Sequence, residues 1–290
     1  MTDILVQDPL KTLRAPNSDK IRSLLDYYES IVALIFARLV DTKDEEADEP
    51  ISKYTVYADI YEGLVEMFTK DTTQSSKGGY YKAITAQPDK YYFKCSKKVI
   101  NLLKNLKMQG KLVYLLTGSY IESASSTAAY CLGPNWKDYF DIIIGNAKKP
   151  AFFYANKEFK CLDGFKATEP ISAQQLELNG VYVNGNWKDL REFIVRHLRN
   201  PNPKCLYVGD HLLQDIYGPS FFLCCDTVAI CEELAGKKHP YEKTINSSFW
   251  GSYFNDEQVD TFWFKLMKDH SKMWFSDMDA LADIKCDSSQ

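Results

Sequence analysis

Five short apolar segments, separated by stretches with helical periodicity, constrain the fold of this chain more than any other feature. Each segment is apolar along almost its whole length instead of alternating with polar residues, which is typical of parallel strands buried on both faces. The segments are residues 112–116, 140–144, 181–183, 205–208 and 227–230. We therefore predict an α/β fold, a parallel sheet with right-handed crossovers.

Helical segments and composition shifts divide the chain further. Helices are predicted over residues 96–108, 120–132 and from about 186 to 199, and two more over residues 18–40 and 54–70. The acidic run at residues 41–49 is expected to be a solvated loop. We predict a polar leader at 1–19, a helical cap-like segment at 20–95, an α/β core at 96–235, and an aromatic C-terminal extension at 236–290 that packs on this core.

Composition excludes several classes of protein. Lys and Arg number 35 against 39 Asp and Glu, a net charge of −4 without the basic excess of nucleic-acid-binding proteins. No apolar window reaches about 18 residues and the N-terminus is no secretory signal, so we expect a cytoplasmic protein without a membrane span. The eight cysteines form no C-x-x-C pair; we expect reduced, mostly buried thiols and no structural metal at cysteine.

Polar side chains follow the predicted strands where a parallel sheet places its ligands. Thr117 follows the first strand, Lys149 comes shortly after the second, and Asp210 follows the fourth with Asp215 five residues later. A hydroxyl and an ammonium suit phosphate oxygens, while carboxylates suit Mg²⁺. Together these groups favour phosphoryl-transfer chemistry.

Each of these residues also has an ordinary structural interpretation. Thr117 can cap the next helix, Lys149 can be a surface lysine, and Asp210 can belong to a turn with Asp215 on a solvated helix. His211 is expected to point away from the acids or only to line the rim. The order and spacing of the whole set favour a joint site over these separate roles.

Three stretches resemble a known family. Residues 115–119, LLTGS, resemble the second motif of the haloacid dehalogenase-like superfamily. Residues 146–153, NAKKPAFF, resemble the third-motif stretch of the cytosolic purine 5′-nucleotidase family, and residues 206–215 resemble its fourth motif, GDxxxxD. The resemblance covers roughly residues 18–256 and implies a Rossmann-like core with a helical cap.

The resemblance also implies an activity and roles for single residues. The activity is magnesium-dependent hydrolysis of a nucleoside monophosphate or another small phosphomonoester. Thr117 and Gly118 would bind the phosphoryl group and Lys149 would neutralise its charge. Asp210 would hold Mg²⁺, with Asp215 supporting the ion directly or through a second layer of contacts.

The family's nucleophile motif, DxDxT, is not found upstream of Thr117. Residues 275–281 contain D-x-D-x-L at Asp277 and Asp279, but this match requires a permuted chain, and the preceding residues 272–275 make a poor buried strand, so we expect surface residues of a tail. The core therefore looks as if it begins after the nucleophile strand, which lies in the middle of the family's sheet. A shortened product and a non-catalytic paralogue both remain open.

Three functional hypotheses follow. The first is a phosphohydrolase of the family type with little or no turnover, because the nucleophile is missing. The second is a non-catalytic nucleotide- or phosphate-binding or regulatory protein. The third is a structural interaction module, based on aromatic residues between 249 and 264, and a homo-oligomer is left open.

Overall fold

The computed structural model describes residues 31–56, 79–232, 234, 255–256, 259–260 and 262–284. The chain forms two compact units, one of residues 1–86 and 235–265 and the other of residues 87–234 and 266–290. Two of the predicted helices lie partly outside the described residues. These parts are residues 57–70 of the helix predicted over 54–70 and the start of the helix predicted from residue 18. The five apolar segments of the sequence all belong to the second unit.

The first unit contains helix α4 (Ile31–Glu46), helix α7 (Gly79–Ala86) and the short antiparallel strands β8 (Asn255–Asp256) and β9 (Val259–Asp260). Helix α4 continues through residues 41–46, so the prediction of a loop from residue 41 is wrong. Arg38 pairs with Glu45 and Lys43 with Glu46, each at 3.7 Å. Lys43 and Glu46 are three residues apart, and pairs at this spacing support an exposed helix by a few tenths of a kcal/mol.

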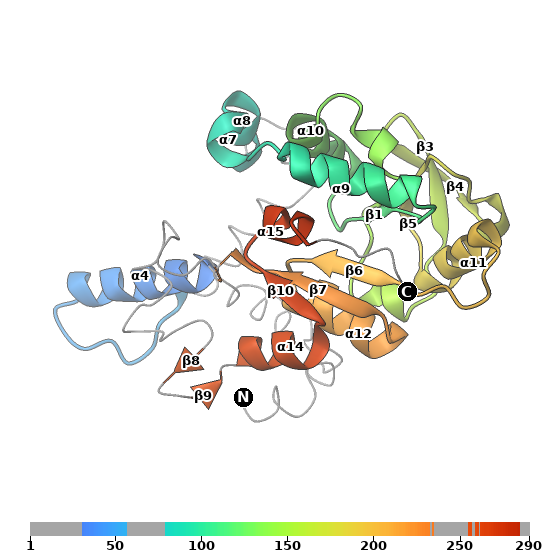
Figure 1. The fold of residues 1–290 in the computed structure, drawn as a ribbon. Helices are drawn as coiled ribbons and strands as arrows, with labels where there is room; N and C mark the ends of the chain where they lie inside the picture. The colour runs from blue at the N-terminus through green and yellow to red at the C-terminus, as the bar shows by residue number, and fades with distance from the viewer. Residues whose placement is uncertain are drawn as a thin grey trace. The chain divides into compact units, whose positions relative to one another are not determined.

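The larger sheet of the second unit has five strands in the order β1-β2-β5-β3-β4 (Figure 1). Strands β1 (Tyr114–Leu116), β2 (Ile142–Gly145) and β5 (Gly180–Asn184) are parallel, as predicted. Strands β3 (Phe159–Asp163) and β4 (Lys166–Ile171) form an antiparallel hairpin that the sequence did not predict. Strand β4 is exposed over most of its length and therefore carries no apolar pattern. Because β3 is antiparallel to both β4 and β5, the sheet is mixed instead of wholly parallel.

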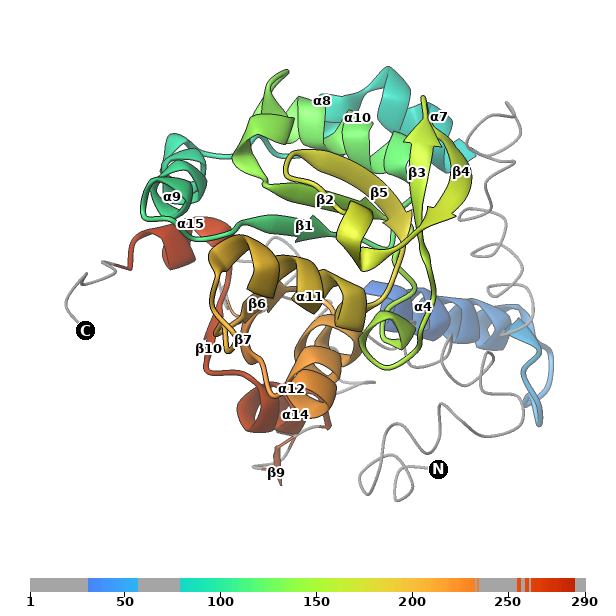
Figure 2. The same cartoon turned by 90° about the vertical axis from the view of Figure 1, so that its right-hand side faces the viewer.

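Helices cover both faces of this sheet, as Figure 2 shows for α10 and α11. Helix α11 (Trp187–Leu198) packs with Ile142 and Ile144 of β2, whereas α10 (Ile121–Leu132) packs with Ile143 on the other face. The three isoleucines are at most 1% exposed. Their continuous apolar run is therefore explained by burial on both sides of the strand.

The helix boundaries follow capping rules. Helix α9 (Lys97–Met108) begins after Ser96, whose side chain accepts a hydrogen bond from the Val99 backbone, and ends before Gly110, which has φ of 72°. The remaining described helices are α8 (Pro88–Tyr91), η1 (Trp136–Tyr139), η2 (Ala151–Phe153), η3 (Ala173–Gln175), η4 (Leu212–Tyr217), α12 (Gly218–Leu223), α14 (Phe262–His270) and α15 (Met278–Ala282). None of the helices in the described part is long and apolar enough to cross a membrane.

A second, three-stranded parallel sheet has the order β10-β7-β6. It contains β6 (Leu206–Gly209) and β7 (Asp226–Ile230), which were predicted, and β10 (Met273–Phe275). As expected of a poor buried strand, β10 lies at the edge of the sheet, where Met273 and Trp274 are each 39% exposed. Asp277 and Asp279 are exposed, but Asp277 caps α15 by accepting from the Ala280 backbone, so they belong to a folded strand–helix unit and not to a tail.

The two sheets meet through side chains. Among the described strands, β1 and β6 are each paired on one side only. The Tyr114 hydroxyl lies 3.1 Å from the Cys205 sulfur, and the rings of Tyr114 and Tyr207 are 6.3 Å apart. Where one continuous sheet was predicted, the described part of the second unit therefore contains two, with β1 at the edge of one and β6 at the edge of the other.

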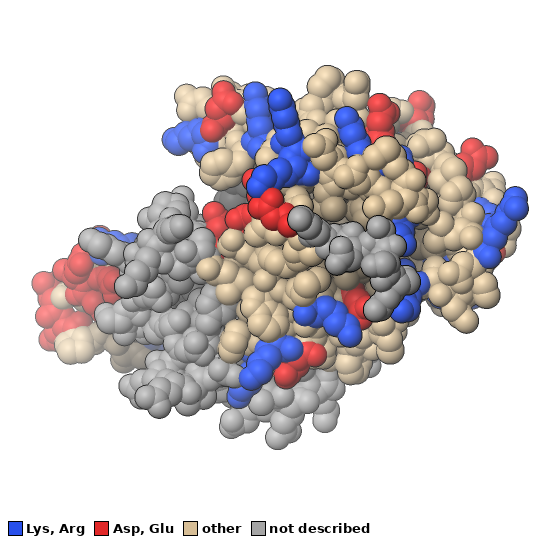
Figure 3. All heavy atoms as spheres, viewed as in Figure 1, with Lys and Arg blue, Asp and Glu red and all other residues tan. Residues whose placement is uncertain are grey.

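Charges on the viewed surface are mixed. Figure 3 shows Lys and Arg interspersed with Asp and Glu over the face seen there, without one continuous basic area. This distribution agrees with the nearly balanced totals of 35 basic and 39 acidic residues.

Candidate functional site

The loops after β1 and β2 are bonded to each other at the carboxyl ends of these strands. The backbone N–H of Ala147 donates to the Thr117 carbonyl at 3.0 Å, and that of Asn146 donates to Ser119 at 2.8 Å. Thr117 itself donates its N–H to the Ile144 carbonyl at 2.9 Å. These bonds hold Thr117 beside the segment that leads to Lys149.

The loop after β2 is in turn joined to the segment after β6 by a buried ion pair. The Lys149 ammonium contacts Asp215 Oδ1, and the two side chains are only 10% and 5% exposed. The Tyr207 hydroxyl donates to the same oxygen at 3.2 Å, while the His211 backbone N–H donates to Asp215 Oδ2 at 3.3 Å. Both carboxylate oxygens of Asp215 are thus engaged by the protein.

Local backbone structure explains how Asp215 reaches this position. The π-helical turn η4 begins shortly after β6, with His211 as its N-terminal cap. The Asp215 N–H donates to the His211 carbonyl at 2.7 Å. Gly209 packs against it so closely that a Cβ there would lie 2.4 Å from the Asp215 Cβ. The glycine of the GDxxxxD stretch is therefore required by the approach of the second aspartate.

Asp210 differs from Asp215 in its surroundings. It is exposed, and no described residue donates a hydrogen bond or forms an ion pair with its carboxylate. The described residues contain no group of three His, Cys, Asp or Glu side chains placed to share an ion. Mg²⁺ commonly binds one or two carboxylates together with substrate phosphate and water, so Asp210 fits an ion that arrives with a phosphate, whereas Asp215 already accepts hydrogen bonds at both carboxylate oxygens.

Thr117 and Gly118 present groups that suit a phosphate oxygen. The Thr117 hydroxyl accepts from the Ser119 N–H at 3.1 Å, so its own hydrogen can donate elsewhere. Gly118 is exposed and places no side chain over its backbone. We name Thr117, Gly118, Lys149, Asp210 and Asp215, with Tyr207, the rim cluster.

The structure brings the predicted residues together to different degrees. Lys149 and Asp215 are in direct contact, Thr117 is joined to their loop through Ala147, and Asp210 stands five residues before Asp215 with no bond to the others. The His211 ring interacts with Gln214, and the His211 backbone N–H donates to Asp215.

Sequence reasoning missed Tyr207 and an asparagine pair. Tyr207 counted only as an apolar strand residue, yet it is 5% exposed and bonded to Asp215. Asn146 comes directly after β2 with a φ of 51°, and Asn184 is the last residue of β5 with a φ of 64°. The Asn146 amide donates to the Asn184 side chain at 3.3 Å. Asparagine tolerates this left-handed conformation, so its place at two strand ends was a usable signal.

Burial and the adjacent Asp215 carboxylate raise the pKa of Tyr207 well above its ordinary value of 10.0. The unfolded chain releases this proton near pH 10 while the folded chain keeps it, so Tyr207's contribution to stability is present below pH 10 and is lost as the pH rises above it.

We expect Tyr207→Phe to make the free energy of unfolding fall less steeply above pH 10, by about 1.4 kcal/mol per pH unit. Urea unfolding at several alkaline pH values measures this slope. Tyr154→Phe, at a 49% exposed position, is the control and should keep the wild-type slope. Equal slopes for wild type and Tyr207→Phe would contradict the role given to this hydroxyl.

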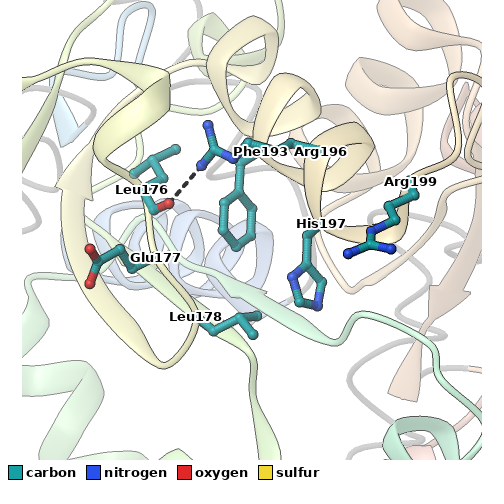
Figure 4. Close-up of a pocket in the computed structure, with 7 residues that line it drawn as sticks. All are labelled: Leu176, Glu177, Leu178, Phe193, Arg196, His197 and Arg199. Carbon is teal, nitrogen blue, oxygen red and sulfur yellow. Dashed lines mark hydrogen bonds between the residues drawn. The ribbon is translucent and has the colours of Figure 1, made fainter.

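A cavity of about 430 Å³ lies elsewhere, between residues 176–178 and the last turn of α11 (Figure 4). Arg196 donates there to the carbonyls of Leu176 at 2.8 Å and Ala173 at 3.2 Å. Residues 176–178 precede β5, so the cavity opens at the amino end of that strand, whereas the rim cluster occupies carboxyl ends. Because Arg196 already holds the loop before β5, we do not assign the phosphate to this cavity.

Comparisons with known proteins found a matching family and several relatives. The profile of the "5' nucleotidase family" matches residues 9–239. The chain is 29% identical over 296 residues to 5'-nucleotidase domain-containing protein 1 of Bos taurus, covering 90% of the chain and 64% of that protein. The Homo sapiens protein of the same name is 28% identical over 299 residues, covering 90% and 65%.

A further relative is 5'-nucleotidase domain-containing protein 2 of Homo sapiens, which is 30% identical over 141 residues, 48% of the chain and 26% of that protein. The chain spans 64% of the length of the Bos taurus protein 1 and 65% of the length of the Homo sapiens protein 1.

Proposed function

Because this chain belongs to the 5' nucleotidase family, we propose that its rim cluster is a phosphomonoester site of the haloacid dehalogenase-like type, which takes a nucleoside 5′-monophosphate. Family membership itself suggests a phosphohydrolase. The observation that carries the proposal is the buried contact of Lys149 with Asp215 beside the bonded loops of Thr117 and Ala147. It draws the segments after β1, β2 and β6 together at strand ends, where parallel sheets bind ligands.

Each residue has a proposed role. The Thr117 hydroxyl and the Gly118 backbone would bind phosphate oxygens. Lys149 has three ammonium hydrogens, and its contacts with Asp215 and Tyr207 leave one for the phosphate. Asp215 is then a positioning residue, because it orients Lys149 and does not touch the ligand.

Mg²⁺ is proposed as the ion that accompanies the phosphate. Asp210 would hold it, since its carboxylate is exposed at the end of β6 and unpaired among the described residues. When bound, the ion would neutralise phosphate charge. Asp215 would act on it only through neighbouring groups, because its oxygens are occupied.

We further propose that the chain as given has little or no turnover. No DxDxT motif precedes Thr117, and D-x-D-x-L at Asp277 lies at β10, separated from β6 by β7. The one-sided pairing of β1 and β6 within the described part supports this proposal, since the family's nucleophile strand belongs in the middle of the sheet. Cysteines without disulfides in that part favour the cytoplasm, and a homo-oligomer stays an alternative.

A phosphate-release assay tests the proposal on turnover. The 290-residue chain, supplied with nucleoside 5′-monophosphates and Mg²⁺, should release no more phosphate than a buffer control. The Asp210→Asn variant should give the same background. Release at ordinary enzymatic rates that Asp210→Asn abolishes would overturn the proposal, because it would require a nucleophile that we have not identified.

The alternative function is a non-catalytic nucleotide-binding or regulatory protein. The same rim cluster favours it, because Thr117, Lys149 and Asp210 bind phosphate and metal without supplying a nucleophile. Calorimetry distinguishes both hypotheses from an inert fragment. Nucleotide binding without phosphate release supports a regulatory protein, whereas the absence of nucleotide binding excludes both hypotheses.

A further inference from the structure

Two cysteines precede neighbouring parallel strands at the same level. Strands β6 and β7 pair with Leu206 opposite Asp226, which places Cys205 and Cys225 side by side one residue earlier. The Asp226 N–H donates to the Cys205 carbonyl at 3.2 Å, so the pairing extends to these residues. Adjacent strands lie about 4.8 Å apart, within the roughly 4.4–6.8 Å Cα separation of disulfides.

The side chains of this pair interact with each other. The register of β6 and β7 places the Cys205 and Cys225 side chains next to each other, and the Tyr114 hydroxyl lies 3.1 Å from the Cys205 sulfur. Neither cysteine is in a disulfide, and both are half-buried, while the adjacent Cys224 is exposed. The expectation of mostly buried cysteines is wrong in this part of the chain, because only Cys231 is buried among the cysteines described.

The surroundings of the two thiols differ. The neighbouring Cys225 thiol, followed by the Tyr114 hydroxyl, lowers the pKa of Cys205 despite its partial burial. The neighbouring Cys205 thiol and burial raise the pKa of Cys225. Because the Tyr114 hydroxyl contacts the Cys205 sulfur, Cys205 is the better thiolate and Cys225 the better proton donor, the division of roles that a reactive pair needs.

We propose that Cys205 and Cys225 form a peroxide-reactive thiol pair that closes to a disulfide between the starts of β6 and β7. The Cys205 thiolate attacks one oxygen of hydrogen peroxide. The S–O bond forms, the O–O bond breaks, and the departing hydroxide takes a proton to become water.

The second step closes the bond. The Cys225 sulfur attacks the Cys205 sulfur of the sulfenic acid, the S–S bond forms, and the hydroxyl leaves with the Cys225 proton as a second water. Two thiols are oxidised and one peroxide is reduced to two waters. The pair lies at the amino end of β6, whereas Asp210 and Asp215 follow its carboxyl end, and neither step of the oxidation uses a residue of the proposed phosphate site.

Mass spectrometry of the folded full-length chain tests the proposal. The chain is treated with hydrogen peroxide, alkylated, unfolded and digested. We expect a peptide in which Cys205 is linked to Cys225, two fewer alkylated thiols than in the untreated chain, and recovery of both after dithiothreitol. Cys161→Ser, at a half-buried cysteine of β3, is the matched control and should still form the link.

Single variants assign the order of the steps. Cys225→Ser should accumulate a sulfenic acid at Cys205 that dimedone traps, whereas Cys205→Ser should leave Cys225 unoxidised. Tyr114→Phe should slow the reaction of Cys205 because one hydrogen bond to its sulfur is lost. Alkylation of both cysteines after peroxide, or a link to Cys224 in place of Cys225, would overturn the proposal, as would dimedone trapping at Cys225 in the Cys205→Ser variant.

Discussion

Asp215→Ala should lower the free energy of unfolding by about 3–5 kcal/mol, the loss typical of removing one partner from a buried ion pair. The reason is that Lys149 is only 10% exposed and would be left buried without a carboxylate beside it. Tyr207 would also lose the oxygen to which it donates at 3.2 Å. Urea unfolding followed by circular dichroism measures the change.

An exposed ion pair supplies the control for this variant. Lys98 and Asp283 lie 2.7 Å apart with side chains that are each 59% exposed, so Asp283→Ala should lower the free energy of unfolding far less than Asp215→Ala does. The double variant Lys149→Met with Asp215→Leu should recover much of the loss, because apolar groups can replace a buried pair. Equal effects of Asp215→Ala and Asp283→Ala would contradict the buried geometry.

Lys149→Met should weaken the binding of a nucleoside 5′-monophosphate by about tenfold or more, because a charge-assisted hydrogen bond contributes about 1.5–3 kcal/mol. Titration calorimetry at a temperature where both proteins are folded measures the change. Lys148→Met is the matched control. It removes an exposed lysine next in the chain, which lies over the Tyr120 ring, and should leave the affinity nearly unchanged.

A larger loss for Lys148→Met than for Lys149→Met would contradict the assignment of the phosphate to the rim cluster. A comparable loss in both would point to general charge attraction instead, and would equally contradict it.

Patterns that depend on burial and capping predict much of this fold. The run Ile142, Ile143, Ile144 identifies a central strand because both of its faces are covered, and Ser96 and Gly110 mark the ends of α9 because they satisfy its terminal groups. The β3–β4 hairpin and β10 could not be found in this way. Strands β4 and β10 are exposed over most of their length and therefore carry no apolar pattern.

The candidate site shows the same limit in another form. The strand-end rule locates Thr117, Lys149 and Asp210, because it needs only the order of strands. It does not reveal that Asp215 is buried against Lys149, 66 residues away in the chain. That contact depends on the π-helical turn after β6 and on the close approach to Gly209, which are properties of the folded backbone.

The central claim is that the rim cluster holds a phosphomonoester and lacks the group that would cleave it. Calorimetric titration of the wild-type chain with a nucleoside 5′-monophosphate and Mg²⁺, followed by a phosphate assay on the same sample, tests it most directly. We predict saturable binding that Asp210→Asn weakens, with no free phosphate above background. An absence of binding heat at millimolar nucleotide, or recovery of the nucleotide as nucleoside and phosphate, would contradict the account.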